Sequence, residues 1–289
     1  MDSNKKAVFK TLLYSDIFDY PLKEEEVFLF LHEKKLSSQA VKQTLGSLPG
    51  IVTKDGYSVL SGREALMTLR KRREQVSKTK KELALQVSTL LFLLPSVYCI
   101  GVSGGVSMEN ADKDDDIDLF VITAKGTLWT TRLWMLLFLQ ILGKRRKREG
   151  RNVNNTICLN MLVDEEHLSF KQSRKDIYTA HEIVQLLPFY ERKETYKRFL
   201  DHNDWVYRLL PNARQLYRHP KKRIHFWVDH IVLGLFKLLE PATRGVQGWY
   251  LSRHQTTEEV SQGVAAFHPR DHKEETLRDY KKRCDAYGV

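Results

Sequence analysis

The chain has few cysteines, and their arrangement suggests neither a disulfide framework nor a zinc site. It holds three, Cys99, Cys158 and Cys284, an odd number that lie far apart in the sequence. Disulfide-stapled domains and zinc sites need close, regular spacings, so both classes are excluded. Cys99 and Cys158 fall within apolar runs, and we expect both to be small buried side chains.

Long apolar runs, internal repeats and low-complexity tracts are also missing. The longest apolar run, 128–142, includes Arg132 and is shorter than the roughly 20 residues that cross a bilayer. The first residues, MDSNKKAVFK, lack the apolar stretch of a secretory signal. We therefore expect a cytoplasmic protein with no membrane partner, and the lack of repeats excludes a solenoid.

Acidic residues are outnumbered by basic ones. There are 47 Lys and Arg against 36 Asp and Glu, which gives a net charge of +11 and a pI near 9.4. This balance favours polyanionic partners such as RNA, DNA or a nucleoside triphosphate. With 289 residues that are 42% hydrophobic, the chain can bury a sizeable core and form two or three domains.

The most informative stretch is 98–123, which reads as a strand, a glycine turn and a second strand that carries acids. Ser103-Gly104-Gly105 forms the turn, and Asp116 and Asp118 sit two residues apart in the second apolar run. Side chains alternate along a strand, so both carboxylates face the same way and repel each other unless a divalent cation binds them. Glycines at the turn let backbone N–H groups approach an anion closely.

This pattern resembles the signature of the polymerase-beta-like nucleotidyltransferase superfamily: a glycine pair, roughly ten residues, then Asp-apolar-Asp on a strand. The resemblance covers roughly 95–165. It implies an α/β (α+β) core with a mixed sheet, Mg²⁺ or Mn²⁺ held by Asp116 and Asp118, and phosphate binding by Ser103, Gly104 and Gly105. The alternative interpretation is an acidic loop, 112–118, that leads into an ordinary strand.

A third carboxylate is commonly supplied in that superfamily by a later strand, here 156–163. Asn160 stands at the position we assign to that acid, where an amide can contact the nucleotide or a metal but adds no negative charge. Asp164 lies further along the strand. Glu182 is a candidate catalytic base or ligand, and a capping box that begins at Thr179 explains it equally well in physical terms.

The flanking segments divide the chain into further modules. Helical spacing and an Asp55-Gly56 hairpin signal predict a winged-helix-like module at 1–62, which either binds nucleic acid or serves for packing. A long connecting helix at 63–94 leads to the nucleotidyltransferase domain at 95–190, and 191–289 reads as a helical C-terminal domain. Prolines punctuate this last region.

Two basic segments are candidates for binding nucleic acid. One is Arg63–Lys81, where eight basic residues face three acids, and the other is the run Lys144–Arg148. Both patterns are equally typical of solvated surfaces. We therefore predict a metal-dependent, ATP- or other NTP-using nucleotidyltransferase that moves a nucleoside monophosphate to a small molecule, RNA or protein and releases pyrophosphate. The alternative is a catalytically weak or inactive module that binds nucleotide or nucleic acid.

Overall fold

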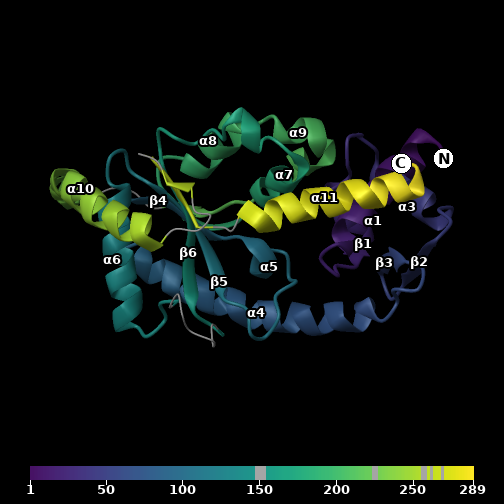
Figure 1. Ribbon diagram of the computed structural model, residues 1–289, viewed down its shortest axis with the longest axis horizontal. Coiled ribbons are helices and arrows are strands. Elements are labelled where there is room, and N and C mark those ends of the chain that lie inside the picture. The colour runs from purple at the N-terminus through teal and green to yellow at the C-terminus, as the bar shows by residue number, and fades with distance from the viewer. Residues whose placement is uncertain (147–153, 223–226, 255–258, 261–262, 268–269) are drawn as a thin grey trace.

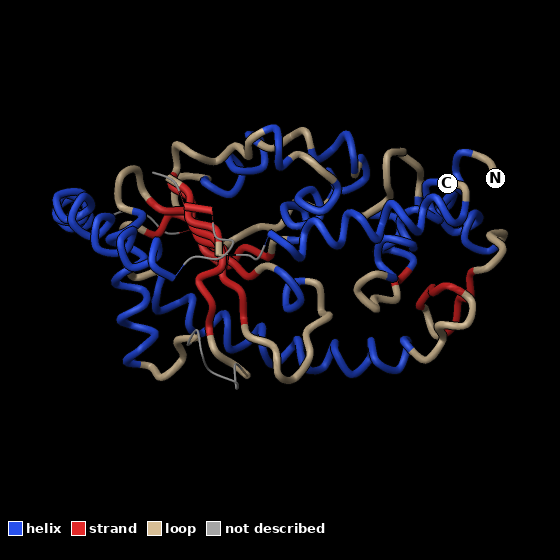
Figure 2. The backbone as a smooth tube through the Cα atoms, in the orientation of Figure 1, coloured by secondary structure: helices blue, strands red, loops and turns tan. Residues whose placement is uncertain are grey.

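A mixed seven-stranded sheet crosses the middle of the molecule, with helices on both faces (Figures 1 and 2). The structure is a computed structural model that describes residues 1–146, 154–222, 227–254, 259–260, 263–267 and 270–289. The strand order is β8-β7-β4-β5-β6-β10-β9. The strands are β4 (Val97–Val102), β5 (Ile117–Thr123), β6 (Ile157–Asp164), β7 (Leu187–Glu191), β8 (Lys221–Lys222), β9 (Glu259–Val260) and β10 (Val264–Ala266).

The centre of the sheet matches the predicted strands within a residue or two. β4 pairs antiparallel with β5, and β5 pairs parallel with β6 because the helix between them crosses over the sheet. The β5–β6 register shifts after the Leu119–Leu159 pair, so that Phe120 pairs with Met161. This bulge leaves Asn160 as the extra residue of β6. The expectation of a mixed α/β sheet is confirmed.

Each face of the sheet packs its own set of helices. Along β5, Ile117, Leu119 and Val121 pack against α4 and α6, while Phe120 and Ile122 pack against α7, α8 and α9. This alternation buries both faces. The helices around the sheet are α4 (Leu66–Leu91), α5 (Gly104–Ser107), α6 (Leu128–Ile141), α7 (Ile177–Gln185), α8 (Thr195–His202) and α9 (Val206–Leu209), with short 3₁₀ turns η1 (Gln172–Arg174) and η2 (Pro211–Gln215).

The N-terminal segment forms three helices and a small antiparallel sheet, as expected from its pattern. Asp55 and Gly56 both have positive φ, 53° and 81°, which is the geometry of a two-residue hairpin turn, and this confirms the hairpin. The elements are α1 (Ser3–Asp16), β1 (Leu22–Lys23), α2 (Glu24–Leu29), α3 (Ser38–Gly46), β2 (Ile51–Lys54) and β3 (Tyr57–Leu60), with strand order β1-β3-β2. This segment packs directly on the rest, since the Tyr20 hydroxyl donates to the Met108 carbonyl.

The region expected to be a helical C-terminal domain differs from the prediction. Strands β8, β9 and β10 of this region join the central sheet, and β10 pairs with β6. They are short and carry little periodic signal, so the longer helices dominated the pattern. The two C-terminal helices are α10 (Trp227–His254), which continues through Pro241, and α11 (Arg270–Tyr287), which ends beside the N-terminus (Figure 1). None of the helices in the described part of the chain is long and apolar enough to cross a membrane.

Candidate functional site

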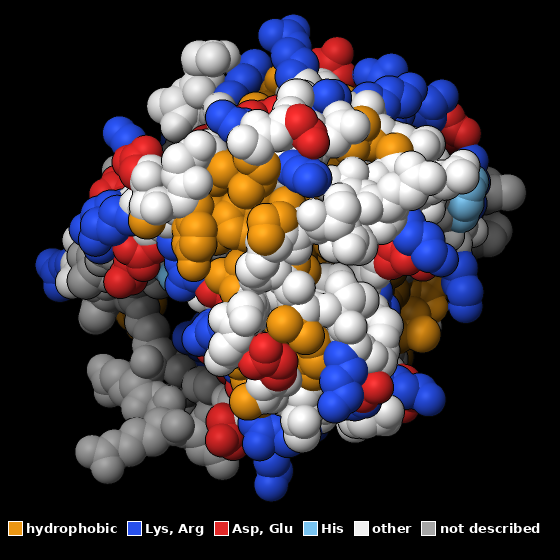
Figure 3. All heavy atoms as spheres, turned by 90° about the vertical axis from the view of Figure 1, so that its right-hand side faces the viewer, with side chains coloured by type: hydrophobic (Ala, Val, Ile, Leu, Met, Phe, Trp, Pro, Cys, Tyr) orange, Lys and Arg blue, Asp and Glu red, His pale blue; other side chains and the backbone are white. Residues whose placement is uncertain are grey.

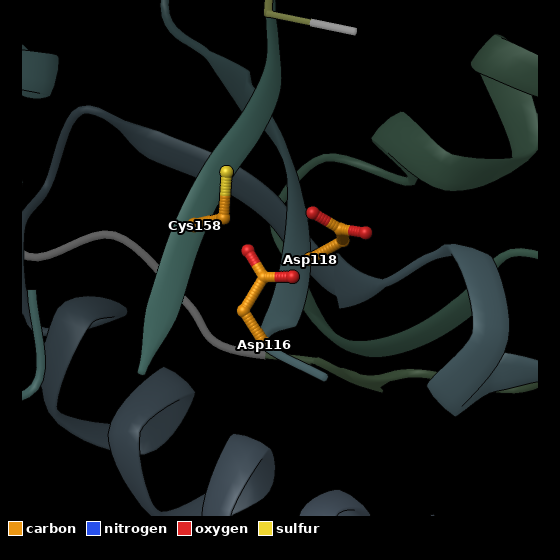
Figure 4. A group of neighbouring side chains, drawn as sticks. All are labelled: Asp116, Asp118 and Cys158. Atoms are coloured by element: carbon orange, nitrogen blue, oxygen red, sulfur yellow. The ribbon is translucent and has the colours of Figure 1, made fainter. Parts of the chain in front are cut away.

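Two carboxylates and a thiol meet on one face of β5 and β6. Asp116 immediately precedes β5, Asp118 lies within it, and Cys158 is paired with Asp118 across the parallel ladder. Ligand atoms of these three side chains all lie within 4.8 Å of one another, and each side chain is partly buried. Figure 4 shows the three side chains converging from the two strands. The structure therefore brings the two predicted carboxylates together.

The glycine turn that follows β4 lies against the Asp118 carboxylate. The Ser103 N–H donates to the Asp118 carbonyl at 2.9 Å, and Gly104 has a φ of +61°. A Cβ added at Gly104 would lie 3.1 Å from Asp118 Oδ2, whereas one at Gly105 would make only an ordinary 3.6 Å contact with Ala111. Backbone conformation and space thus favour glycine at 104 and leave room for a side chain at 105.

Side chains of α4 hold the loop that precedes Asp116. The Lys80 ammonium is buried and donates to the carbonyls of Lys113 and Asp115 at 3.0 and 2.7 Å. Arg73 pairs with Asp112 at 2.7 Å. These contacts give Asp116 a defined position before any ligand binds.

Cations of the predicted basic segment Arg63–Lys81 mostly serve such internal contacts. Seven of its eight basic side chains, all but Lys78, bind acids or carbonyls within the part of the chain that the structure describes. They are Arg63, Arg70, Lys71, Arg72, Arg73, Lys80 and Lys81. Charge that is already paired contributes little to binding a phosphate backbone.

Arg146, from the second basic run, reaches the carboxylates. Its guanidinium donates to Asp116 Oδ2 at 2.6 Å and also hydrogen-bonds the Cys158 thiol. The rest of that run is less informative, because Lys147 and Arg148 lie outside the described residues. Arg146 thus supplies positive charge to Asp116 at the edge of the site.

Asp118 carries a charge that its surroundings do not fully balance. Burial, together with the negative charges of Asp116 and Glu182, raises the pKa of Asp118 to about 7. Burial also raises the pKa of Glu182 to about 7. Both groups are therefore part protonated near neutral pH, and a bound cation would favour their ionised forms.

Glu182 lies in the middle of α7, not at its start. The N-cap is Asp176, whose Oδ1 accepts from the Thr179 N–H at 2.9 Å. The capping box that was the alternative explanation for Glu182 is therefore wrong. Instead Glu182 lines two cavities beside the sheet.

The two cavities adjoin at Tyr178 and Glu182. The smaller, about 230 Å³, is walled by Gly104, Gly105 and Asp118 and by aromatic side chains of the N-terminal module. The larger, about 680 Å³, has an apolar floor, and its polar lining includes three cations, Lys171, Arg174 and Lys273, beside Ser103. Substrate-sized space therefore adjoins Asp118, which lines the smaller cavity, and Glu182, which lines both.

The other two candidates for a third acid lie elsewhere. Asn160, the bulged residue of β6, is buried, and its Nδ2 has no hydrogen-bond partner among the described residues. It lines neither of the two cavities beside the carboxylates. Asp164 is paired with Thr123 at the far end of β5 and bonds His167 at 2.6 Å.

Sequence reasoning missed two neighbours of the site, Cys158 and His181, and named Arg146 only as part of the basic run Lys144–Arg148. Cys158 was expected to be a buried apolar residue, but it is partly exposed beside Asp118, a position that the parallel pairing of β5 and β6 creates. His181 lines the smaller cavity and bonds His32 at 3.0 Å, and burial lowers its pKa to about 3. The only sequence signal for His181 is that it immediately precedes Glu182.

The donor set fits a hard divalent cation held by the carboxylates. Mg²⁺ and Mn²⁺ prefer oxygen ligands, and Asp116 and Asp118 offer them from one face. A thiolate ligand would favour softer metals; without a metal, burial raises the pKa of the Cys158 thiol and keeps it protonated. The cluster therefore offers two oxygen donors and one sulfur donor from a single face.

Comparison with known proteins found no match. No family model matches the chain, and neither the curated proteins nor the solved structures include one that does.

Proposed function

We propose that the chain is a metal-dependent nucleotidyltransferase that moves a nucleoside monophosphate from an NTP to an acceptor hydroxyl or similar group, releasing pyrophosphate. The observation that carries the proposal is the convergence of Asp116 and Asp118 beside the glycine turn at Gly104, whose φ is positive and which lies against Asp118. Carboxylate pairs next to a phosphate-accepting turn are the parts that phosphoryl and nucleotidyl transfer need.

The side chains around the cavities have separable roles in this proposal. Mg²⁺ or Mn²⁺ at Asp116 and Asp118 would neutralise charge on the phosphates. The turn at Ser103, Gly104 and Gly105 would approach the β and γ phosphates through the backbone. Because the pKa of Glu182 is about 7, a fraction of it is ionised at neutral pH and can accept a proton from the acceptor.

The acceptor remains open between a small molecule, RNA and protein. The larger cavity favours a small molecule, since it lies between the sheet, α7 and α11 and combines an apolar floor with a rim of three cations and three acids. Internal pairing of the α4 cations counts against a long nucleic-acid track on that helix. The winged-helix-like interpretation of 1–62 belongs to this proposal as well, and we favour a packing role because its aromatic side chains wall the smaller cavity.

A catalytically weak nucleotide-binding module is the second candidate. It is favoured by the absence of a third acid at the position beside Asp118, where β6 places Cys158. Whether Glu182 acts as a catalytic base distinguishes the nucleotidyltransferase from the nucleotide-binding module.

Calorimetric titration of each NTP with Mn²⁺ tests the proposal. The Asp116→Asn, Asp118→Asn double variant should lose metal-dependent binding, while Asp114→Asn, an exposed acid of the same loop, should bind as the wild type does. Transfer of label from α-labelled NTP to components of a cell extract then separates the enzyme from the binding module. Unchanged metal-dependent binding in the double variant would contradict the site.

A further inference from the structure

Arg146 brings a cation into direct contact with the carboxylate cluster of the candidate site. Its guanidinium Nη1 donates to Asp116 Oδ2 at 2.6 Å, and the guanidinium also donates to the Cys158 sulfur. Asp116, Asp118 and Cys158 are the three side chains whose ligand atoms lie within 4.8 Å of one another. The guanidinium therefore contacts two of the three side chains that make up the candidate metal site.

This pair differs from the exposed ion pairs of the surface. At the end of the molecule where the two termini lie, cations and acids are interspersed (Figure 3). Exposed pairs such as Lys71–Asp55, in which both side chains are 52% exposed, contribute little energy. Asp116, by contrast, is only 15% exposed, whereas Arg146 is 45% exposed. A cation with open access to solvent thus pairs with a carboxylate that has little.

The backbone of Arg146 is held in place independently of its side chain. Its N–H donates to the Ile157 carbonyl at 3.1 Å, and the Ile157 N–H donates to the Lys144 carbonyl at 2.6 Å. These bonds attach this stretch of chain to the first residue of β6, the strand that carries Cys158. Rotation about the side-chain bonds of Arg146 can therefore release Asp116 while the backbone keeps the residue beside the site.

Lys80, which contacts the loop before Asp116, does not have that freedom. Its ammonium is buried and donates to the carbonyls of Lys113 and Asp115 at 3.0 and 2.7 Å. Because these acceptors are backbone groups, Lys80 fixes the loop and not the carboxylate of Asp116. Of these two cations, only Arg146 can exchange its partner without disturbing the loop.

A divalent cation reverses the net charge that surrounds Arg146. With both carboxylates ionised, Asp116, Asp118 and Arg146 together carry one net negative charge, and a bound divalent cation changes this to one net positive charge. The bound cation then repels the guanidinium and neutralises the carboxylates that attracted it. A phosphate bound to the same cation offers a new partner, because its oxygens match the planar fork of arginine.

We propose that Arg146 is an exchangeable counter-ion of this site. It binds Asp116 and Cys158 until a divalent cation arrives, and it then moves to a phosphate of the ligand that this cation carries. The ligand class is therefore a polyphosphate that binds as its metal complex. The phosphate step rests on the nucleotide site proposed above, whereas the exchange with metal requires only the carboxylate cluster.

Calorimetric titration with Mn²⁺ alone tests the exchange without nucleotide. Arg146→Gln should bind Mn²⁺ about fivefold more tightly than the wild type, because no cation has to leave the carboxylates. Arg145→Gln is the matched control and should bind Mn²⁺ as the wild type does, since Arg145 is exposed and forms no ion pair within the described part of the chain. Equal Mn²⁺ affinity in Arg146→Gln and the wild type overturns the exchange but not the metal site. No Mn²⁺ binding by either protein overturns both.

Inorganic tripolyphosphate in excess Mn²⁺ tests the phosphate step with the group that all NTPs share. Arg146→Gln should bind it about tenfold more weakly than the wild type, since one charge-assisted phosphate contact is lost. Arg146→Lys, which keeps the charge but not the fork, should give an intermediate affinity. Without metal, Arg146→Gln should have little effect on any binding, because Asp116 holds the guanidinium. Unchanged affinity in excess Mn²⁺, or an equal loss with and without Mn²⁺, overturns the phosphate step.

Discussion

Two clusters of partly buried charge, one around Arg70 and one around Asp118, differ in how their charges are balanced. The fully buried Arg70 guanidinium bonds Glu26 and Glu74 at 2.8 and 3.0 Å and lies over the Tyr20 ring. Burial alone would raise the pKa of Glu74, but hydrogen bonds from Lys23, Arg70 and Tyr57 outweigh it and lower that pKa. Here each charge stabilises its neighbour.

Around Asp118, by contrast, the negative charges are not fully neutralised by neighbouring cations. Burial and neighbouring acids raise the pKa of Asp118, and Arg146 reaches only the outer edge of the group. Folding brings together charges that it does not neutralise, a pattern concentrated at functional sites. The Arg70 cluster is thus expected to stabilise the fold, and the Asp118 cluster to be stabilised by a ligand.

The largest expected effect is the loss of the Arg70 cluster. Arg70→Met should lower the free energy of unfolding by about 4 kcal/mol, because two carboxylates lose their buried partner. Lys78→Met, an exposed cation of the same helix, should change it by less than about 0.5 kcal/mol. Urea denaturation followed by circular dichroism measures both. Adding Glu26→Gln and Glu74→Gln to Arg70→Met should recover part of the loss, and no recovery would mean that packing alone is responsible.

The Asp118 cluster should make the metal-free protein less stable as pH rises. Between about pH 4 and pH 7 the folded state holds protons on Asp118 and Glu182 that the unfolded state has released, so stability falls across this window. We expect a loss of about 2 kcal/mol between pH 5 and pH 8, since partial exposure reduces the effect. Thermal unfolding in buffers of equal ionic strength measures it.

Mn²⁺ added at pH 8 should restore most of this loss, because the cation neutralises the ionised carboxylates. Asp118→Asn should remove the part of the pH dependence that Asp118 contributes, leave the part that Glu182 contributes, and abolish the response to metal. If Asp118→Asn keeps the wild-type pH profile, the pKa of Asp118 does not control stability.

The glycine turn offers a smaller and more local test. Gly104→Ala should cost about 1.5 kcal/mol, because φ is positive there and the new Cβ would press on Asp118 Oδ2. Gly105→Ala, which meets only ordinary contacts, should be close to neutral. Chemical denaturation compares the two, and equal costs would show that the turn does not depend on the left-handed conformation at 104.

Much of the centre of the molecule was predictable because local patterns and packing agree there. Strands β4, β5 and β6, helix α4 and the Asp55-Gly56 hairpin follow from apolar periodicity and turn chemistry. The face shared by Asp116 and Asp118 follows from strand alternation alone. What failed depends on pairing between distant segments: short edge strands such as β10 carry too little pattern of their own.

Strand pairing also decides which residue of β6 lies where a third acid of the site would be expected. Alternation along β6 places Asn160 on the face of Cys158, but the bulge after the Leu119–Leu159 pair breaks the alternation. A bulge is a property of two paired strands, so one strand's sequence does not reveal it. Similarly, the cations of α4 looked like a surface for phosphates until tertiary contacts paired them with acids from other loops.

The smallest expected effect concerns where a third acid would complete the Asp118 cluster. Cys158→Asp would place a carboxylate directly beside Asp118, and we expect Mn²⁺ affinity to rise about fivefold, as one added charge near a cation contributes about 1 kcal/mol at a partly exposed site. Asn160→Asp should leave that affinity within twofold and destabilise the fold, because it buries a charge away from both cavities. Calorimetric Mn²⁺ titration of the two variants compares equal added charge at neighbouring positions of one strand. If Asn160→Asp raises Mn²⁺ affinity more than Cys158→Asp does, Asn160 and not Cys158 lies where a third ligand would bind the metal.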